Sequence, residues 1–274
     1  MATELGADRR SLARYAAGVV AVVLAISSQY FVPQTWPASR VVYTSLLGDV
    51  TVVYVVPVVA FAALVGAAPL RRWRANLGAA GVVGLSWYGA LMLLAVVLTI
   101  GLAVAYAFFD PGALKLLGRP NPALQAAASD PWFYVGFSFV VGAFEETIFR
   151  GWVFGYWVGR QGTWVMPAVL SSALFAGLHI YYGTTYGVAT PLIVPTLFLG
   201  GFALAATYRS TGGNLVVPAL LHGANDAAAY LTLISLAVGT AVHWSLILGG
   251  ALVGLVYFVV RPARAGTPAP PPGT

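Results

Sequence analysis

The chain contains no cysteine and few charged residues. Without cysteine, neither a disulfide framework nor a thiolate metal site can form, so any bound metal would depend on histidine and carboxylate ligands. Charged residues make up 8% of the 274 residues, whereas 59% are hydrophobic and the mean hydropathy is +0.84. An ordinary soluble domain is about 25% charged. The composition therefore excludes an ordinary soluble protein and predicts an integral membrane protein.

Long apolar runs alternate with short polar connections along most of the chain. A membrane-crossing helix needs about 20 apolar residues. We count about eight such runs, which predicts an all-α, polytopic membrane helix bundle. They cover roughly residues 15–32, 43–68, 80–107, 132–158, 164–182, 189–208, 215–235 and 239–260. The first run follows three arginines in the manner of a signal peptide, but the membrane pattern continues, so we expect an uncleaved first span.

The polar residues that need an explanation are confined to the middle of the chain. We therefore predict an N-terminal region of three spans (1–130), a core that carries the intramembrane polar residues (131–235), and a last span with a proline-rich tail (236–274). The end of the tail has no apolar surface to bury, so we expect it to be extended and disordered.

The chain has a net charge of +6, and most of its Lys and Arg residues are predicted to lie on one side of the membrane. With the N-terminus inside, ten arginines lie on the inner side and three cations on the outer side; the inner ones are Arg9, Arg10, Arg14, Arg71, Arg72, Arg74, Arg160, Arg209, Arg261 and Arg264, and the outer ones are Arg40, Lys115 and Arg119. This bias predicts that both termini are cytoplasmic, so the charge needs no nucleic-acid partner. Thirteen arginines against one lysine are typical of a GC-rich prokaryote, which favours a prokaryotic cell membrane.

Two adjacent carboxylates and a guanidinium lie in the fourth apolar run, in the segment GAFEETIFRG (142–151). Each ionisable group near the bilayer centre costs about 2.5–3.5 kcal/mol, so these side chains must face protein or water. Glu146 and Arg150 are four residues apart and can form an ion pair on one helix face. Glu145 points about 100° away and lacks that partner, which suits a general base. A purely structural polar cluster would explain the same residues.

Two later apolar runs carry histidines. His179 follows Phe175 by four residues in the fifth run, where a single histidine is also a common hydrogen-bonded interior residue. His222 and Asp226 are four residues apart in the seventh run and share a helix face. The carboxylate there either orients the imidazole or joins it at a metal or a reacting oxygen. Because three runs place Glu or His inside the hydrocarbon, we expect these side chains to meet in one cavity.

Together the three motifs resemble the signature of the CPBP (CAAX protease and bacteriocin-processing) intramembrane proteases, a family that includes the CAAX prenyl proteases. That signature reads Glu-Glu-x-x-x-Arg, Phe-x-x-x-His and His-x-x-x-Asn/Asp. Residues 145–150, 175–179 and 222–226 match it in order and in separate apolar runs. Over residues 131–235 the resemblance implies a catalytic core that hydrolyses peptide bonds within the membrane, as an intramembrane metalloendopeptidase.

The resemblance also implies a role for each motif residue. The implied catalytic residues are Glu145, Glu146, His179, His222 and Asp226, and the implied supporting residues are Arg150, Phe175 and Asn225. In the family's scheme Glu145 and His179 activate a water molecule, while His222 and the residue at position 226 stabilise the oxyanion. Many members have Asn at the last position, which can donate a hydrogen bond, whereas an ionised Asp can only accept. Asp226 must therefore be protonated, orient His222 or bind a metal. Asn225 does not take over the donor role of an Asn at position 226, because its side chain faces about 100° away.

A divalent metal, zinc above all, is the cofactor that the family implies. His179, His222 and a carboxylate from Glu145 or Asp226 would give three ligands and leave room for a water molecule, which zinc would activate. The chain lacks the His-Glu-x-x-His, Gly-x-Ser-x-Gly and Gly-x-Gly-Asp motifs, so zincins and the serine and aspartyl intramembrane proteases fit poorly.

Two other classes of function are open at this point. A proton-coupled or cation transporter would use the buried carboxylates as a relay, although the chain has no convincing internal repeat. A non-catalytic membrane partner or immunity protein would keep the fold without needing Glu145 and His179. For a protease, the expected partners are the lipid bilayer and a peptide or membrane-protein substrate, either a prenylated C-terminal peptide or a bacterial polypeptide. The oligomeric state is not predicted.

Overall fold

The computed structural model describes residues 2–36, 38, 48, 50–73, 78–110, 128–161, 163–180, 187 and 190–260. Within these ranges the chain is helical and contains no strand, so the all-α prediction is confirmed for them. The α-helices are α1 (Ala2–Thr35), α4 (Val56–Leu64), α5 (Gly78–Phe109), α8 (Pro131–Glu146), α9 (Gly155–Gln161), α10 (Val165–Leu178), α12 (Thr190–Ser210), α13 (Val216–Ile234) and α14 (Leu236–Val260). Shorter segments are the π-helical η2 (Val50–Val55) and η4 (Thr147–Phe154) and the 3-10 helix η3 (Ala68–Arg72).

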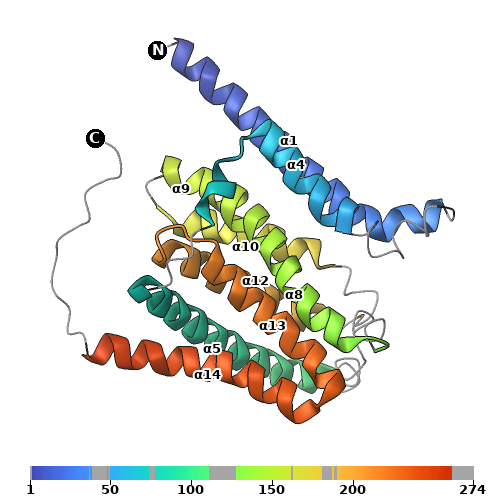
Figure 1. The fold of residues 1–274 in the computed structure, drawn as a ribbon, viewed down its shortest axis with the longest axis vertical. Helices are drawn as coiled ribbons and strands as arrows, with labels where there is room; N and C mark the ends of the chain where they lie inside the picture. The colour runs from blue at the N-terminus through green and yellow to red at the C-terminus, as the bar shows by residue number, and fades with distance from the viewer. Residues whose placement is uncertain are drawn as a thin grey trace.

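The helices that carry the polar motifs occupy the middle of the bundle. Figure 1 shows α1 and α4 together along one edge, α5 and α14 along the opposite edge, and α8, α10, α12 and α13 between them. α13 packs against α8 and α14, α5 packs against α12 and α14, and α10 packs against α12. The polar side chains of α8 and α13 can therefore be shielded from lipid by their neighbours.

Four described helical segments are long and apolar enough to cross a membrane. They are Arg10–Gln29, Ala80–Phe109, Thr190–Ser210 and Leu236–Val256. Their outer faces expose large apolar side chains such as Val20, Ile100 and Leu252, which suits contact with hydrocarbon rather than water. The chain is therefore an integral membrane protein, as predicted. The helices that carry the polar motifs are not among the four, and the predicted number of spans stays a prediction.

The fifth predicted span ends earlier than the sequence suggests. The sequence predicts a span over residues 164–182, but α10 ends at Leu178 and His179 is its C-cap residue. A helix of 14 residues is about 21 Å long, less than the hydrocarbon thickness of about 30 Å. His179 therefore lies at the end of a helix that is too short to cross the membrane. The second predicted span, 43–68, is described from residue 50 onward, as η2 and α4.

The fourth predicted span, 132–158, is a continuous helical segment in three parts. Its start is fixed by Asp130, whose Oδ1 accepts a hydrogen bond from the backbone N–H of Phe133 at 3.1 Å. α8 then runs to Glu146, and the chain continues without interruption as η4 and α9. π-helical turns are rare and often occur at functional sites. Here η4 begins directly after the glutamate pair, and all of its residues are buried.

Glycines bring α8 and α13 into direct backbone contact. A Cβ atom added at Gly142 would lie 2.9 Å from both Ala219 O and Gly223 N, and one added at Gly223 would lie 2.7 Å from Phe139 Cα. Any larger residue would therefore push the two helices apart. This contact fixes the separation of the helix with the two glutamates from the helix with the second histidine motif.

Sequence spacing also predicts a close approach of another helix at Gly151, Gly155 and Gly159. At Gly151 and Gly155 an added Cβ would lie 2.9 Å from Pro69 Cβ and 3.3 Å from Arg72 Nη1, respectively. The helix that approaches Gly151 and Gly155 is therefore the short 3-10 helix η3. The side chains from residue 159 to 162 lie outside the described part of the structure.

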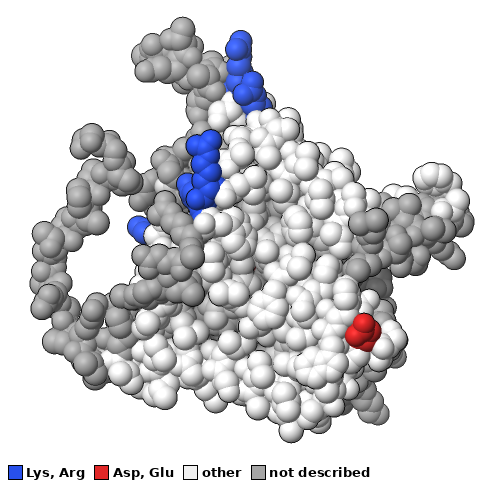
Figure 2. Space-filling model, in the orientation of Figure 1, with Lys and Arg blue, Asp and Glu red and all other residues white. Residues whose placement is uncertain are grey.

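Other predictions concern residues that the structure does not describe. The expected outer-side cations Arg40, Lys115 and Arg119 and the expected disordered tail lie outside the described residues. On the face shown in Figure 2, the described Lys and Arg side chains gather toward the end that holds the N-terminus. The cytoplasmic location of the termini and the division of the chain into three regions stay predictions.

Candidate active site

Glu146 and Arg150 form a fully buried ion pair. Arg150 Nη1 donates to Glu146 Oε1 at 2.6 Å, and both side chains are 0% exposed. Arg150 Nη2 donates to the backbone carbonyl of Gly201 on α12 at 2.7 Å. The guanidinium carbon also lies 5.2 Å from the centre of the Phe175 ring on α10, within cation–π range. The pairing predicted from the sequence spacing is present, and Arg150 connects three helical segments.

His222 on α13 lies between the two glutamates. Its Nδ1–H donates to Glu146 Oε1 at 2.7 Å. On the other side of the ring, Nε2 lies 3.6 Å from Glu145 Oε2 and 3.5 Å from Asp226 Oδ2. The adjacent glutamates thus face the two different nitrogens of one imidazole ring. The structure therefore brings together the first and third motifs, as expected from the sequence.

The three carboxylates differ in their access to the surroundings. The side chain of Glu146 is 0% exposed, that of Glu145 is 11% exposed, and that of Asp226 is 34% exposed. Glu146 is therefore sealed into the protein, where its Oε1 accepts from both Arg150 and His222. Glu145 and Asp226 are the two carboxylates that a water molecule or a peptide can reach.

The ring of Phe175 links the two histidine motifs. Its centroid lies 4.6 Å from the centroid of the His179 ring and 5.8 Å from that of the His222 ring. His179 Nδ1–H donates to the backbone carbonyl of Phe175 at 2.7 Å. In a neutral ring this bond places the lone pair on Nε2, so His179 is held in one tautomer. His179 therefore adjoins the other two motifs through the ring of Phe175.

Two positioning features were not foreseen from the sequence. The carbonyl of Gly201 is a backbone acceptor, so no residue type marks it. Gly142 and Gly223 could have been found from the sequence, because each stands inside or beside a polar motif. In the structure each contacts the opposite helix. The predicted supporting residue Asn225 has a buried Oδ1 without a hydrogen-bond partner among the described residues. Its supporting role stays a prediction.

The described residues contain no group of three or more His, Cys, Asp or Glu side chains arranged to hold a metal ion. Of the predicted ligands, His222 Nε2 and Glu145 Oε2 lie 3.6 Å apart, and His179, with Nδ1 bound to the Phe175 carbonyl, has only Nε2 left for a metal. As arranged, these residues do not fit a zinc site. Zinc stays a prediction that requires the rings of His179 and His222 to converge.

Taken together, these features define a helical membrane protein with a buried acid–base site. Residues 127–228 match the family model described as Type II CAAX prenyl endopeptidase Rce1-like. This segment contains all three motifs, so the predicted family is confirmed: the chain carries a domain of the CAAX protease family, which implies protease activity. The chain has no match among curated proteins or among solved structures.

Proposed function

We propose that this protein is an intramembrane endopeptidase and that Glu145 is the general base that activates water. The observation that carries the proposal is the position of the two glutamates on opposite sides of His222. Glu146 is neutralised by Arg150 and sealed from the surroundings, so it can hold the ring but not attack a substrate. Glu145 lies next to the same ring, has no arginine partner and remains partly accessible.

The reaction needs a proton to move from water to the leaving amine. Glu145 takes one proton from a water molecule while the water oxygen attacks the carbonyl carbon of the scissile peptide bond. The carbonyl oxygen becomes an oxyanion, and the tetrahedral intermediate then collapses as the C–N bond breaks. Glu145 returns its proton to the departing nitrogen, so the products are an amine and a carboxyl group. His179, held in one tautomer by the Phe175 carbonyl, assists by accepting a hydrogen bond from the water.

His222 is assigned to the oxyanion. Glu146 accepts the hydrogen on Nδ1, and carboxylate oxygens of Glu145 and Asp226 face Nε2. A ring with hydrogen on both nitrogens donates to Glu146 from Nδ1 and keeps its Nε2–H, which lies 3.5–3.6 Å from the other two carboxylates, available for the developing oxyanion. Asp226 then acts as a positioning residue, because an ionised carboxylate cannot itself donate to the oxyanion.

The substrate class follows from the surroundings of the site. Membrane helices enclose the site, and their outer faces carry exposed apolar side chains such as Phe139 and Leu220. A peptide bond must enter this apolar environment to reach Glu145, which favours a membrane-associated peptide or protein over a soluble one. A prenylated C-terminal peptide, the substrate type named in the description of the matching family, is one such substrate.

The test compares peptide fragments in membranes that hold the wild-type protein or Glu145→Gln. A general base contributes about 10²–10⁴-fold to the rate, so fragments that depend on the protein should disappear in the variant while its folding is unchanged. Ser138→Ala is the matched control, since Ser138 is buried on the same helix and its hydroxyl bonds only to the Tyr134 carbonyl. Its cleavage pattern should equal that of the wild type.

Three outcomes would contradict the proposal. Normal cleavage by a folded Glu145→Gln protein would remove Glu145 as the base. Cation or proton flux that depends on Glu145, in proteoliposomes without any cleavage, would identify a transporter instead. A cellular function that survives loss of both Glu145 and His179 would identify a non-catalytic partner.

A further inference from the structure

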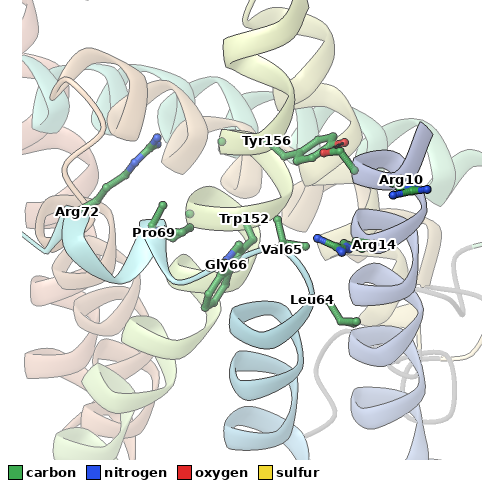
Figure 3. Close-up of a pocket in the computed structure, with 13 residues that line it drawn as sticks. Arg10, Arg14, Leu64, Val65, Gly66, Pro69, Arg72, Trp152 and Tyr156 are labelled. Carbon is green, nitrogen blue, oxygen red and sulfur yellow. Dashed lines mark hydrogen bonds between the residues drawn. The ribbon is translucent and has the colours of Figure 1, made fainter. Parts of the chain in front are cut away.

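A cavity of about 470 Å³ lies outside the active site, between α1, the connection from α4 to η3, and the η4–α9 segment. Figure 3 shows Arg10 and Arg14 on α1 at one side of it, Arg72 on η3 at the other, and Trp152 and Tyr156 on the wall between. None of the described residues that line it is acidic. The cavity therefore carries positive charge from three arginines.

The walls of the cavity are fixed by specific contacts. Gly66 has a φ of +109°, a conformation that L side chains rarely adopt, and it reverses the chain between α4 and η3. Its carbonyl accepts a hydrogen bond from Trp152 Nε1 at 2.8 Å. On the opposite wall, Ser11 Oγ and Tyr156 OH lie 3.0 Å apart in a hydrogen bond between α1 and α9. These bonds hold the three walls together around the cavity.

Two of the arginines have no anionic partner in the described part of the protein. Arg10 and Arg14 are exposed, lie four residues apart on α1, and form no salt bridge with any described residue. Like charges at this spacing destabilise a helix, and an anion placed between them would relieve the repulsion. Arg72 differs from them because its Nη1 donates to Tyr208 OH.

The cavity lies at the boundary between membrane and water. The first apolar span begins at Arg10, and the short apolar helix Val50–Leu64 ends at Leu64, so two membrane segments terminate at the cavity. Leu70 and Trp73, on either side of Arg72 in the chain, are exposed. Trp side chains are enriched at the level of the lipid headgroups. An anion that enters the cavity is therefore at headgroup level.

We propose that this cavity binds the phosphate group of an anionic phospholipid, with Arg10 and Arg14 as its main contacts. Guanidinium groups match phosphate oxygens through paired hydrogen bonds, and basic pockets between membrane helices bind anionic headgroups. The volume is within the range of about 300–1,000 Å³ that is usual for small-ligand sites. A free phosphate ion has the same chemistry, so the experiment separates the two sources.

Bound lipid would affect the helix that carries the active site. Gly151, Trp152, Gly155 and Tyr156 of the cavity wall belong to the segment that continues directly from Glu146. A lipid that joins α1 to this segment would stabilise it. The binding itself does not depend on proteolysis, so the proposal can fail or succeed independently of the proposed function.

The experiment uses the full-length protein in a neutral detergent and follows its thermal unfolding. It titrates a short-chain phosphatidylglycerol, the matching phosphatidylcholine, or inorganic phosphate. Phosphatidylglycerol should raise the melting temperature in a saturable way, and phosphatidylcholine should not. An arginine near a membrane surface contributes about a fivefold factor to the binding of anionic lipid, so Arg10→Gln/Arg14→Gln should weaken the apparent affinity about 25-fold.

Two matched controls make the result specific. Arg71→Gln removes an exposed arginine that is adjacent to Arg72 but does not line the cavity, so the affinity should change little. Ala68→Glu places a negative charge in the cavity and should abolish binding, whereas Ala67→Glu, at an exposed neighbouring residue outside it, should not. Because both alanines are exposed, neither change should prevent folding.

Saturable stabilisation by phosphatidylglycerol that is lost in the cavity variants and kept in the controls would support the proposal. Inorganic phosphate could also stabilise the protein as strongly as the lipid does, through the same arginines. The cavity would then be a phosphate site, and the proposal that its ligand is a phospholipid would be overturned. Equal loss of binding in Arg71→Gln and Arg10→Gln/Arg14→Gln would overturn the site, since the effect would then be that of surface charge in general. No stabilisation by either ligand would overturn it as well.

Discussion

Replacement of Arg150 by methionine tests whether the buried ion pair holds the active-site helices together. Met has a similar length and no charge, so the change leaves the carboxyl group of Glu146 0% exposed and without its guanidinium partner. Removal of one member of a buried pair costs about 3–5 kcal/mol of folding free energy. The lost hydrogen bond to the Gly201 carbonyl adds about 1 kcal/mol. We therefore expect Arg150→Met to lose about 4–6 kcal/mol, a large part of the stability of an ordinary domain.

A double-mutant cycle with Glu146→Gln separates charge from packing. In the double variant no buried carboxylate remains at position 146, so the free energy of unfolding should recover by about 2–3 kcal/mol relative to Arg150→Met alone. Unfolding is measured by tryptophan fluorescence in mixed micelles at increasing denaturing detergent. Arg71→Met is the control, because Arg71 is exposed and its loss should change stability by less than about 0.5 kcal/mol.

The reasoning would be refuted by two results. A loss below about 1 kcal/mol for Arg150→Met would mean that the pair behaves like an exposed one. Strict additivity of the two single changes would mean that the charges of Glu146 and Arg150 do not interact. The double variant should also cleave poorly although part of its stability returns, since an amide at position 146 is a weaker acceptor for the His222 Nδ1–H than the carboxylate.

Three further changes test other parts of the site. Asp226→Asn should keep activity within about tenfold of the wild type, because it restores an amide that can donate to the oxyanion; a folded but inactive variant, in a peptide-cleavage assay, would show that a carboxylate is required there. Gly223→Ala should destabilise the protein by about 1–3 kcal/mol and lower activity, since its Cβ would lie 2.7 Å from Phe139 Cα, whereas Gly136→Ala, with nothing within 4 Å, should not. If the predicted zinc is present, elemental analysis of the purified protein should find about one equivalent, and His179→Ala should reduce it; a metal-free, active enzyme would exclude this cofactor.

Local features of the site follow directly from spacing in the sequence. Residues four apart on a helix share a face. The pairing of Glu146 with Arg150 and the position of Asp226 beside His222 could therefore be predicted from the amino-acid sequence. The cost of burying ionisable groups predicts that they meet, and the glutamates do flank the ring of His222. These inferences use local geometry and burial alone.

Other features depend on irregular backbone that spacing does not encode. The segment η4 winds with π-helical turns, and Gly155 N–H bonds to the carbonyl of Arg150, five residues earlier. Beyond Arg150, a count of 3.6 residues per turn therefore no longer gives the face on which a residue lies. The end of α10 at Leu178 was missed because neither Gly nor Pro occurs between it and Tyr182 to mark the end of a helix.

The balance of charge in the site gives a physical reason for its reactivity. Glu145, Glu146 and Asp226 contribute three negative charges when ionised, whereas Arg150 and a doubly protonated His222 contribute two positive ones. The cluster therefore has one negative charge in excess, and the accessible carboxylates are those of Glu145 and Asp226. When Glu145 takes a proton from water, its negative charge passes to the attacking oxygen and then to the oxyanion near Nε2 of His222, so the total charge of the site is unchanged and the step adds no buried charge.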